Sequence, residues 1–194
     1  PRVTVMTLVV AQSPRPASAS EQRDAARRLL GIGLERAFGL PPADVEVERT
    51  SDGKPRLLGR PDVHFNIAHC PAAVAVAVAD QAVGVDVEEI RARDPYVAAR
   101  CFDASELDRV EAATDPDREF FRYWTLKESY VKALGTGLSH PLRSVRFAVS
   151  ADGEPESDLR AGFRLVEQFP GVIVALCWLQ RRASVYPDLV HVEW

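Results

Sequence analysis

Three closely spaced apolar strands between residues 63 and 88 constrain the fold of this chain more than any other feature. The first two segments, 63–70 and 74–79, flank a turn at Pro71, and the third, 82–88, follows two polar residues. Short apolar runs of this kind, rich in β-branched residues and separated by turn residues, predict a hairpin of buried strands followed by a third strand. The sequence therefore predicts a fold in which β-strands occupy the centre.

The order of elements around these strands occurs twice. A helix, a strand and a hairpin are predicted between residues 21 and 79, and the same order recurs between residues 117 and 178. The turns of the two hairpins are also similar, since each contains a proline. This weak internal repeat predicts an α+β fold of two similar halves, residues 1–90 and 91–194, in one compact unit with a site between them.

Composition restricts the functions that such a chain can have. The 194 residues are 46% hydrophobic and 27% charged, with a net charge of −4, so nucleic acid is not the expected partner. No apolar run approaches the roughly 18 residues of a membrane span. Three cysteines, without CxxC spacing, favour a reducing compartment over a disulfide scaffold or a structural zinc site. We therefore expect a cytoplasmic protein with no membrane contact.

One predicted helix carries most of the candidate chemistry. Asp115 can cap its start, Pro116 would take the first helical position, and Gly135 would end it. Glu128 and Lys132 are four residues apart, so they would share one face of the helix. That spacing fits a surface ion pair, and it also fits a site in which the carboxylate binds a metal and the lysine binds a phosphate.

Lysine is rare in this chain. Of the 24 Lys and Arg residues, only Lys54, Lys127 and Lys132 are lysines. The compact ammonium group differs from guanidinium in shape and hydration, so a site that needs a point charge would resist replacement by arginine. The distribution of lysine therefore favours functional sites at the candidate helix and at the turn 51–55.

The strand 82–88 places two further carboxylates on one face. Period two puts three valines on one side and Gly84, Asp86 and Glu88 on the other, and the glycine allows another group to approach the backbone closely. The alternative is an exposed polar face on an edge strand. If Asp86 and Glu88 meet Glu128 between the halves, three carboxylates form an oxygen-donor site of the kind that Mg²⁺ prefers.

Candidate phosphate-binding residues are more ambiguous. Arg23, Arg27 and Arg28 lie on the predicted helix 21–38 and could simply form a solvated basic face. His69 ends a predicted buried strand, where a structural histidine is the commoner occurrence. The motifs GxxxxGK[ST] and GxGxxG are absent, which excludes the common nucleotide-binding loops.

Four segments in this order resemble the 4′-phosphopantetheinyl transferases, specifically their Sfp-type, pseudo-dimeric branch. The segments are Gly53-Lys54-Pro55, the FNIAH run 65–69, the VGVDVE run 83–88, and the WTLKES motif at 124–129 with Lys132 and the GTGL run after it. The resemblance covers about residues 50–140, and the remaining thirds match only in outline. It implies the fold of that family, an intramolecular pseudo-dimer that acts as a monomer.

The resemblance also implies a reaction. Such enzymes transfer 4′-phosphopantetheine from coenzyme A to a serine of an apo acyl or peptidyl carrier protein, release 3′,5′-ADP, and need Mg²⁺ or Mn²⁺. By this resemblance Asp86, Glu88 and Glu128 would hold the metal, Lys132 would contact the pyrophosphate, and Glu128 would be the base for the serine. The branch implies polyketide or nonribosomal peptide synthesis, with fatty-acid carriers as a further class.

The resemblance assigns the coenzyme A contacts as well. Lys54 and Pro55 would flank the adenine, and His69 with the arginines of the first helix would reach the 3′-phosphate. The alternative function is a carrier-protein-binding module of the same fold without catalysis, against which the retained carboxylates argue. The full set of implied coenzyme A contacts is Arg23, Arg27, Arg28, Lys54, Pro55, Ala68, His69 and Lys132.

Overall fold

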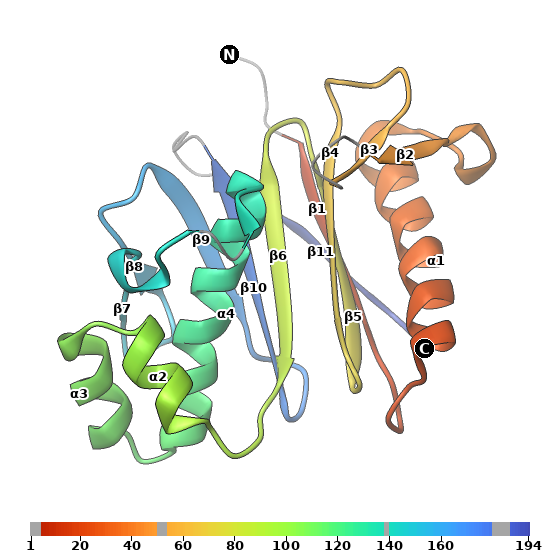
Figure 1. Ribbon diagram of the computed structural model, residues 1–194. Coiled ribbons are helices and arrows are strands. Elements are labelled where there is room, and N and C mark those ends of the chain that lie inside the picture. Colours follow the sequence, from red (N-terminus) through yellow and green to blue (C-terminus); the bar gives the residue numbers. More distant parts are fainter. Residues whose placement is uncertain (1–4, 50–53, 138–139, 180–186) are drawn as a thin grey trace.

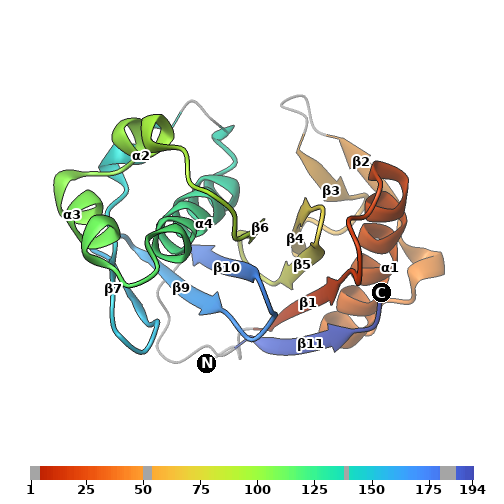
Figure 2. The same cartoon turned by 90° about the horizontal axis from the view of Figure 1, so that it is seen from below.

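The computed structural model describes residues 5–49, 54–137, 140–179 and 187–194. Two β-sheets lie face to face between two long helices, so the molecule has four layers (Figure 1). Helix α1 (Ala19–Phe38) covers the outer face of one sheet, and helix α4 (Pro116–Leu134) covers the outer face of the other (Figure 2). This arrangement confirms the predicted α+β class.

The two sheets have four and three strands, in the orders β11-β1-β5-β4 and β6-β10-β9. The strands of the first sheet are β1 (Met6–Gln12), β4 (His64–Cys70), β5 (Ala73–Ala79) and β11 (Asp188–Val192). Those of the second sheet are β6 (Val83–Glu89), β9 (Ala161–Val166) and β10 (Val172–Leu179).

Shorter elements complete the described chain. They are the 3₁₀ helices η1 (Pro42–Asp44) and η3 (Leu142–Ser144), the paired strands β2 (Val47–Arg49) and β3 (Pro55–Leu57), the helices α2 (Pro95–Cys101) and α3 (Ala104–Ala112), and the paired strands β7 (Ala148–Val149) and β8 (Pro155–Glu156).

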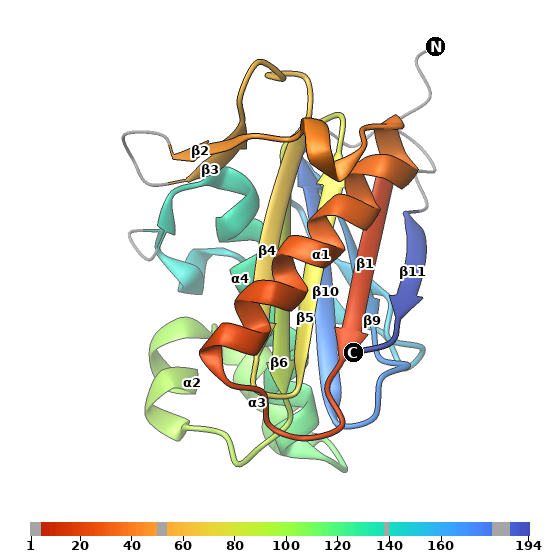
Figure 3. The same ribbon diagram turned by 90° about the vertical axis from the view of Figure 1, so that its right-hand side faces the viewer.

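The main hydrophobic core lies between the two sheets. The valines of β6 face it, together with the alternate alanines of β5 and inward residues of β1 and β10, which confirms the predicted alternation along β6. A second cluster forms between α1 and the four-stranded sheet, where Figure 3 shows the helix lying across β4, β5 and β1. A third forms beneath α4. Each long helix therefore packs on its own sheet, as in an intramolecular pseudo-dimer.

Strand pairing crosses residue 90 at two places. Strand β6 pairs antiparallel with β10, and β11 pairs parallel with β1. The division into halves at residue 90 stays a prediction, because the sheets themselves mix early and late segments.

The edges of the two sheets meet at β4 and β6, which are neighbours but are not joined by a backbone ladder. Instead, the side chain of Asn66 on β4 accepts a hydrogen bond from the backbone N–H of Val85 on β6, at 2.8 Å. This side-chain hydrogen bond takes the place of backbone pairing between the two edge strands. The face of β6 that carries Asp86 packs against α4.

The ends of α4 agree with the prediction. Asp115 accepts a hydrogen bond from the N–H of Arg118, Pro116 opens the helix, and Gly135 ends it with a φ of 74°. Gly53 and Leu138, which belong to two of the motifs quoted above, lie outside the described residues. Among the helices of the described residues, none combines the length and the apolar character needed to cross a membrane.

Candidate active site

Helix α4 lies directly on β6 because Gly84 has no side chain. A Cβ atom at this position would lie within 3.0 Å of backbone atoms of Ser129 and Ala133 on α4, closer than Cβ atoms come in real structures. Asp86 is two residues further along the same face of β6. The close approach therefore places this carboxylate under the helix that carries Glu128 and Lys132.

Lys132 forms its ion pair with Asp86. Its Nζ donates to Asp86 Oδ1 at 2.6 Å, and the Asp86 side chain is only 7% exposed. The pair joins a helix to the strand beneath it across 46 positions of sequence. The structure therefore differs from a surface pair between Glu128 and Lys132 one helical turn apart.

Two buried carboxylate oxygens where α4 meets β6 have no hydrogen-bond partner. They are Asp86 Oδ2 and Glu128 Oε1. Burial raises the pKa of Asp86, although Lys132 acts in the opposite direction. Burial also raises the pKa of Glu128, and the neighbouring charge of Asp86 raises it further. Unpaired buried oxygens are costly, so this site favours the binding of a proton or a cation.

Glu88 is more fully occupied. Its Oε1 accepts from Trp124 Nε1 at 3.1 Å, and its Oε2 pairs with the exposed Arg91 at 2.9 Å. Accordingly, no three His, Cys, Asp or Glu side chains of the described residues form a group that could hold a metal ion as they stand. The unpaired oxygens of Asp86 and Glu128 fit a hard cation such as Mg²⁺, whereas Glu88 would first have to leave its present partners.

A pocket of about 570 Å³ lies between β3, the turn that follows it and the start of β4. Lys54 and Pro55 line it, and Lys54 Nζ donates to the backbone oxygen of Lys132 at 3.4 Å, which connects the pocket to the last turn of α4. His64 also lines the pocket, and burial together with the charge of Lys54 lowers its pKa. This volume suits a small ligand or part of one.

His64 received no role from the sequence. Its strand was predicted, but a single histidine at the start of a strand is a weak signal. Its position in the pocket depends on the packing of β3 against β4, which the sequence pattern does not show. The structure thus adds one pocket residue beside the predicted Lys54 and Pro55.

The remaining predicted contacts lie at the other end of β4. His69 is exposed, and Ala68 next to it is buried in the core between the sheets. Gln22 at the start of α1 donates to the backbone oxygen of Cys70, so this end of β4 adjoins the first turns of α1 and hence Arg23. The structure brings His69 and Arg23 to one end of the molecule.

Arg27 and Arg28, the other two arginines of α1 that the resemblance assigned to coenzyme A, are exposed and have partners within the protein. Arg27 pairs with Asp24 at 3.2 Å, and Arg28 donates to the backbone oxygen of Glu193 at 2.6 Å. Nothing in these contacts aims either side chain at the cleft of Asp86. Their assignment to a phosphate stays a prediction.

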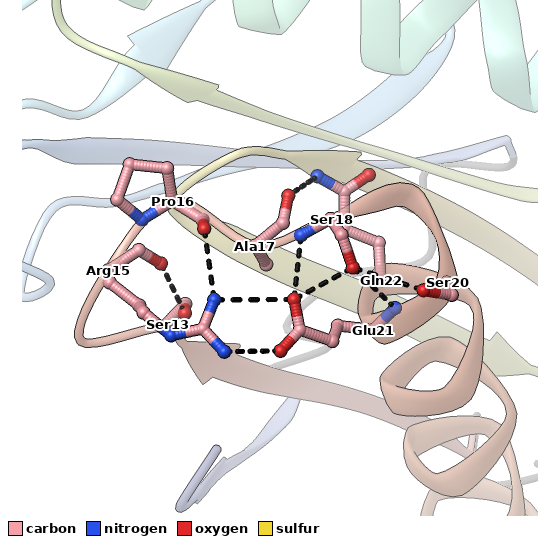
Figure 4. Close-up of polar contacts among 8 residues, drawn as sticks. All are labelled: Ser13, Arg15, Pro16, Ala17, Ser18, Ser20, Glu21 and Gln22. Carbon is pink, nitrogen blue, oxygen red and sulfur yellow. Dashed lines mark hydrogen bonds and ion pairs between the residues drawn. The ribbon is translucent and has the colours of Figure 1, made fainter.

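A further arginine precedes α1 in the loop that joins it to β1. Figure 4 shows that both terminal nitrogens of Arg15 donate to Glu21, whose carboxylate also accepts from the backbone N–H and the hydroxyl of Ser18. Through these hydrogen bonds Arg15 and Ser18 lower the pKa of Glu21 to about 2. No role was predicted for Arg15, since one arginine in a Pro- and Ser-rich loop has no distinguishing pattern.

Lys127 is not part of the cleft. Its side chain is fully buried, and it forms an ion pair with Glu106 of α3. The scarcity of lysine therefore pointed to Lys54 and Lys132 but also to Lys127, whose role is structural.

Comparison with known proteins identifies relatives. A family model described as the 4′-phosphopantetheinyl transferase superfamily matches residues 82–177. The chain is 31% identical over 182 residues to the 4′-phosphopantetheinyl transferase psf-1 of Bacillus pumilus, an alignment that covers 88% of this chain and 78% of the relative. It is 32% identical over 180 residues to the 4′-phosphopantetheinyl transferase Sfp of Bacillus subtilis strain 168, covering 86% and 77%. A 4′-phosphopantetheinyl transferase of Bacillus subtilis is 34% identical over 149 residues, covering 73% and 66%.

Proposed function

Since this chain belongs to the 4′-phosphopantetheinyl transferase superfamily, we propose that it transfers 4′-phosphopantetheine from coenzyme A to a serine of an apo carrier protein. The observation that carries this proposal is the pair of unsatisfied buried oxygens, Asp86 Oδ2 and Glu128 Oε1, beside the ammonium of Lys132. A module that only bound carrier proteins would have no need for these costly groups.

We propose Mg²⁺ as the metal, with Asp86 and Glu128 as its ligands and Glu88 as a third ligand after it releases its present partners. The donor set is all oxygen, which suits Mg²⁺ and, less selectively, Mn²⁺. When bound, such an ion would supply positive charge beside the pyrophosphate of coenzyme A.

The residues of the chain have distinct tasks in this proposal. Glu128 accepts the proton of the carrier serine on a carboxylate oxygen, directly or through a water. The serine oxygen then forms a bond to the pantetheine phosphorus, and the bond from that phosphorus to the bridging oxygen breaks, which releases 3′,5′-ADP. Lys132 neutralises charge on the phosphoryl oxygens.

Binding of coenzyme A uses the remaining residues. The pocket lined by Lys54 and Pro55 would take the adenine, and His69 with Arg23 would be available to the 3′-phosphate. Because both parts of the site come from one chain, we propose a monomer, and we expect it to act in the cytoplasm. Carrier proteins of polyketide or nonribosomal peptide synthesis are the proposed acceptors.

The test is the mass of an apo carrier protein after incubation with coenzyme A, Mg²⁺ and this protein. The wild type should convert the carrier to its holo form, and Asp86→Asn should lose several orders of magnitude in rate. Asp24→Asn, which removes an exposed carboxylate from α1, is the matched control and should keep normal turnover. Binding of the carrier without any gain in mass would instead support the non-catalytic module.

A further inference from the structure

Among the described residues, two ion pairs involve the proposed metal ligands, and the pair of Lys132 with Asp86 is the more buried. The side chains of Lys132 and Asp86 are 31% and 7% exposed, whereas those of Arg91 and Glu88 are 58% and 20% exposed. The ammonium is bound to one oxygen of Asp86, and the other oxygen has no partner. Lys132 is therefore the principal counter-ion of a nearly buried carboxylate.

A cation bound to Asp86 would compete with this ammonium. A buried carboxylate without a positive partner is strongly disfavoured, so the ammonium stabilises the ligand-free protein. The same ammonium, held against Asp86 Oδ1, would repel a divalent ion bound to the same carboxylate. Without another ligand, the metal would have to displace the Lys132 ammonium or bind beside it against their mutual repulsion.

An anion in the cleft changes this balance. A pyrophosphate would offer the ammonium new acceptors within reach of its flexible stem, and Lys54 next to it adds a second cation on the pocket side. Release of Asp86 by Lys132 would then open both oxygens of that carboxylate to the metal. By thermodynamic linkage, the metal would in turn strengthen the binding of the anion by the same factor.

We infer that Lys132 acts as a resident counter-ion, which takes the place of the divalent cation at Asp86 until coenzyme A arrives and so makes metal and coenzyme A bind together. This inference rests on the proposed function of the cleft. It goes beyond a phosphate contact by Lys132, because it assigns the same side chain a role before any substrate is bound.

The test is a calorimetric titration with Mg²⁺, with and without coenzyme A and without carrier protein, so that no transfer occurs. In the absence of coenzyme A, Lys132→Gln should bind Mg²⁺ about tenfold or more tightly than the wild type. The gain in Mg²⁺ affinity that coenzyme A produces should be smaller by the same factor. Arg91→Gln is the matched control, because it removes an exposed charge beside Glu88, and it should change Mg²⁺ affinity less than about threefold.

Equal Mg²⁺ affinity of Lys132→Gln and the wild type without coenzyme A would overturn the inference. If carrier proteins were still converted by the wild type, the proposed function would stand. Failure of Mg²⁺ to bind any variant, even with coenzyme A, would overturn both the metal assignment and this inference, and the mass assay would report separately on transfer.

Folding of the variant provides a second measurement. Lys132→Gln and Lys132→Met should melt at lower temperature than the wild type in a chelator, because Asp86 has lost its counter-ion. Mg²⁺ should restore most of that loss if it takes the place of the ammonium. Melting that Mg²⁺ does not restore in either variant would contradict the inference.

Discussion

Lys127 Nζ lies 2.8 Å from Glu106 Oε2, and both side chains are fully buried. The ammonium also donates to the backbone oxygens of Leu142, at 3.0 Å, and Val145, so its three N–H donors meet three acceptors. The other oxygen of Glu106 accepts from the N–H of Phe147 at 3.0 Å. One buried pair thus joins α4 to α3 and to the segment that follows α4.

Removal of the lysine should therefore be costly. Lys127→Met leaves Glu106 buried without its positive partner, and we expect the free energy of unfolding to fall by about 3–5 kcal/mol, measured by urea denaturation. Replacing Glu106 by Gln in the same variant should recover part of the loss. The matched control is Arg56→Met, which breaks an exposed pair with Glu48 and should cost about 1 kcal/mol or less. A similar loss in the two single variants would contradict this role.

The carboxylates of the cleft should differ in importance. Asp86→Ala should lower turnover by several orders of magnitude with little change in melting temperature, since the cost of burying Asp86 with one unpaired oxygen offsets its ion pair with Lys132. Glu88→Ala should be milder, because both of its oxygens already have protein partners. Steady-state transfer rates at several Mg²⁺ concentrations measure both. A larger defect in Glu88→Ala would reverse the assignment.

Glu128→Gln should lower the transfer rate and raise the stability of the fold. The folded protein raises the pKa of Glu128, so the ionised form is disfavoured in the fold, and stability falls as pH rises through that raised pKa. Glutamine removes the effect. In a chelator at pH 7 the variant should melt higher than the wild type, and the difference should vanish below about pH 4, where the glutamate is protonated in both states.

Transfer by the same variant should be strongly reduced, because glutamine cannot accept the proton of the serine. Melting curves from pH 3.5 to 8 together with transfer rates make the comparison. A variant that melts lower at pH 7 would show that the ionised carboxylate stabilises the fold.

Lys54→Ala should raise the KM for coenzyme A about tenfold while kcat changes little, because this residue lines the pocket proposed for the adenine. Arg36→Ala is a suitable control, since Arg36 is exposed, pairs with Asp188 of β11 and is not among the residues that line the pocket, so it should leave KM unchanged. Initial rates at varied coenzyme A measure the difference. A fall in kcat without a change in KM would place Lys54 at the reaction rather than at the pocket.

Gly84→Ala should disturb the whole site. The added methyl group would meet the backbone of α4, which cannot yield as a side chain can, so we expect a loss of about 1–3 kcal/mol or more and a shift of α4 away from Asp86. Gly33→Ala is the matched control, because its methyl group would meet the side chain of Val78 instead. Thermal melting should show a larger loss of stability for Gly84→Ala than for Gly33→Ala. Titration with Mg²⁺ should show weaker binding for Gly84→Ala alone.

Local sequence patterns predicted most of the regular structure. The alternation of β6 and the capped helix that ends at Gly135 appear in the structure as expected, because both depend on neighbouring residues alone. The same patterns did not predict β3 or β8, since strands of two or three residues have too few side chains to show a period.

The candidate site was predictable in its members but not in its contacts. Spacing placed Glu128 and Lys132 on one helix face, yet the partner of Lys132 is Asp86, which sequence separates from it by 46 positions. Lys127 shows the opposite case. It is one residue from Glu128, but a helix turns by about 100° per residue, so its side chain enters the core while Glu128 reaches the cleft.

The pairing of β11 with β1 has a consequence for synthesis of the chain on the ribosome. Strand β1 is made long before β11, and its outer edge stays open until Asp188–Val192 has been made. Strand β6 likewise has no strand of its own sheet to pair with until β10 has been made. An open edge can pair with strands of other chains, so the nascent chain depends on Asp188–Val192 to cover the edge that β1 leaves open.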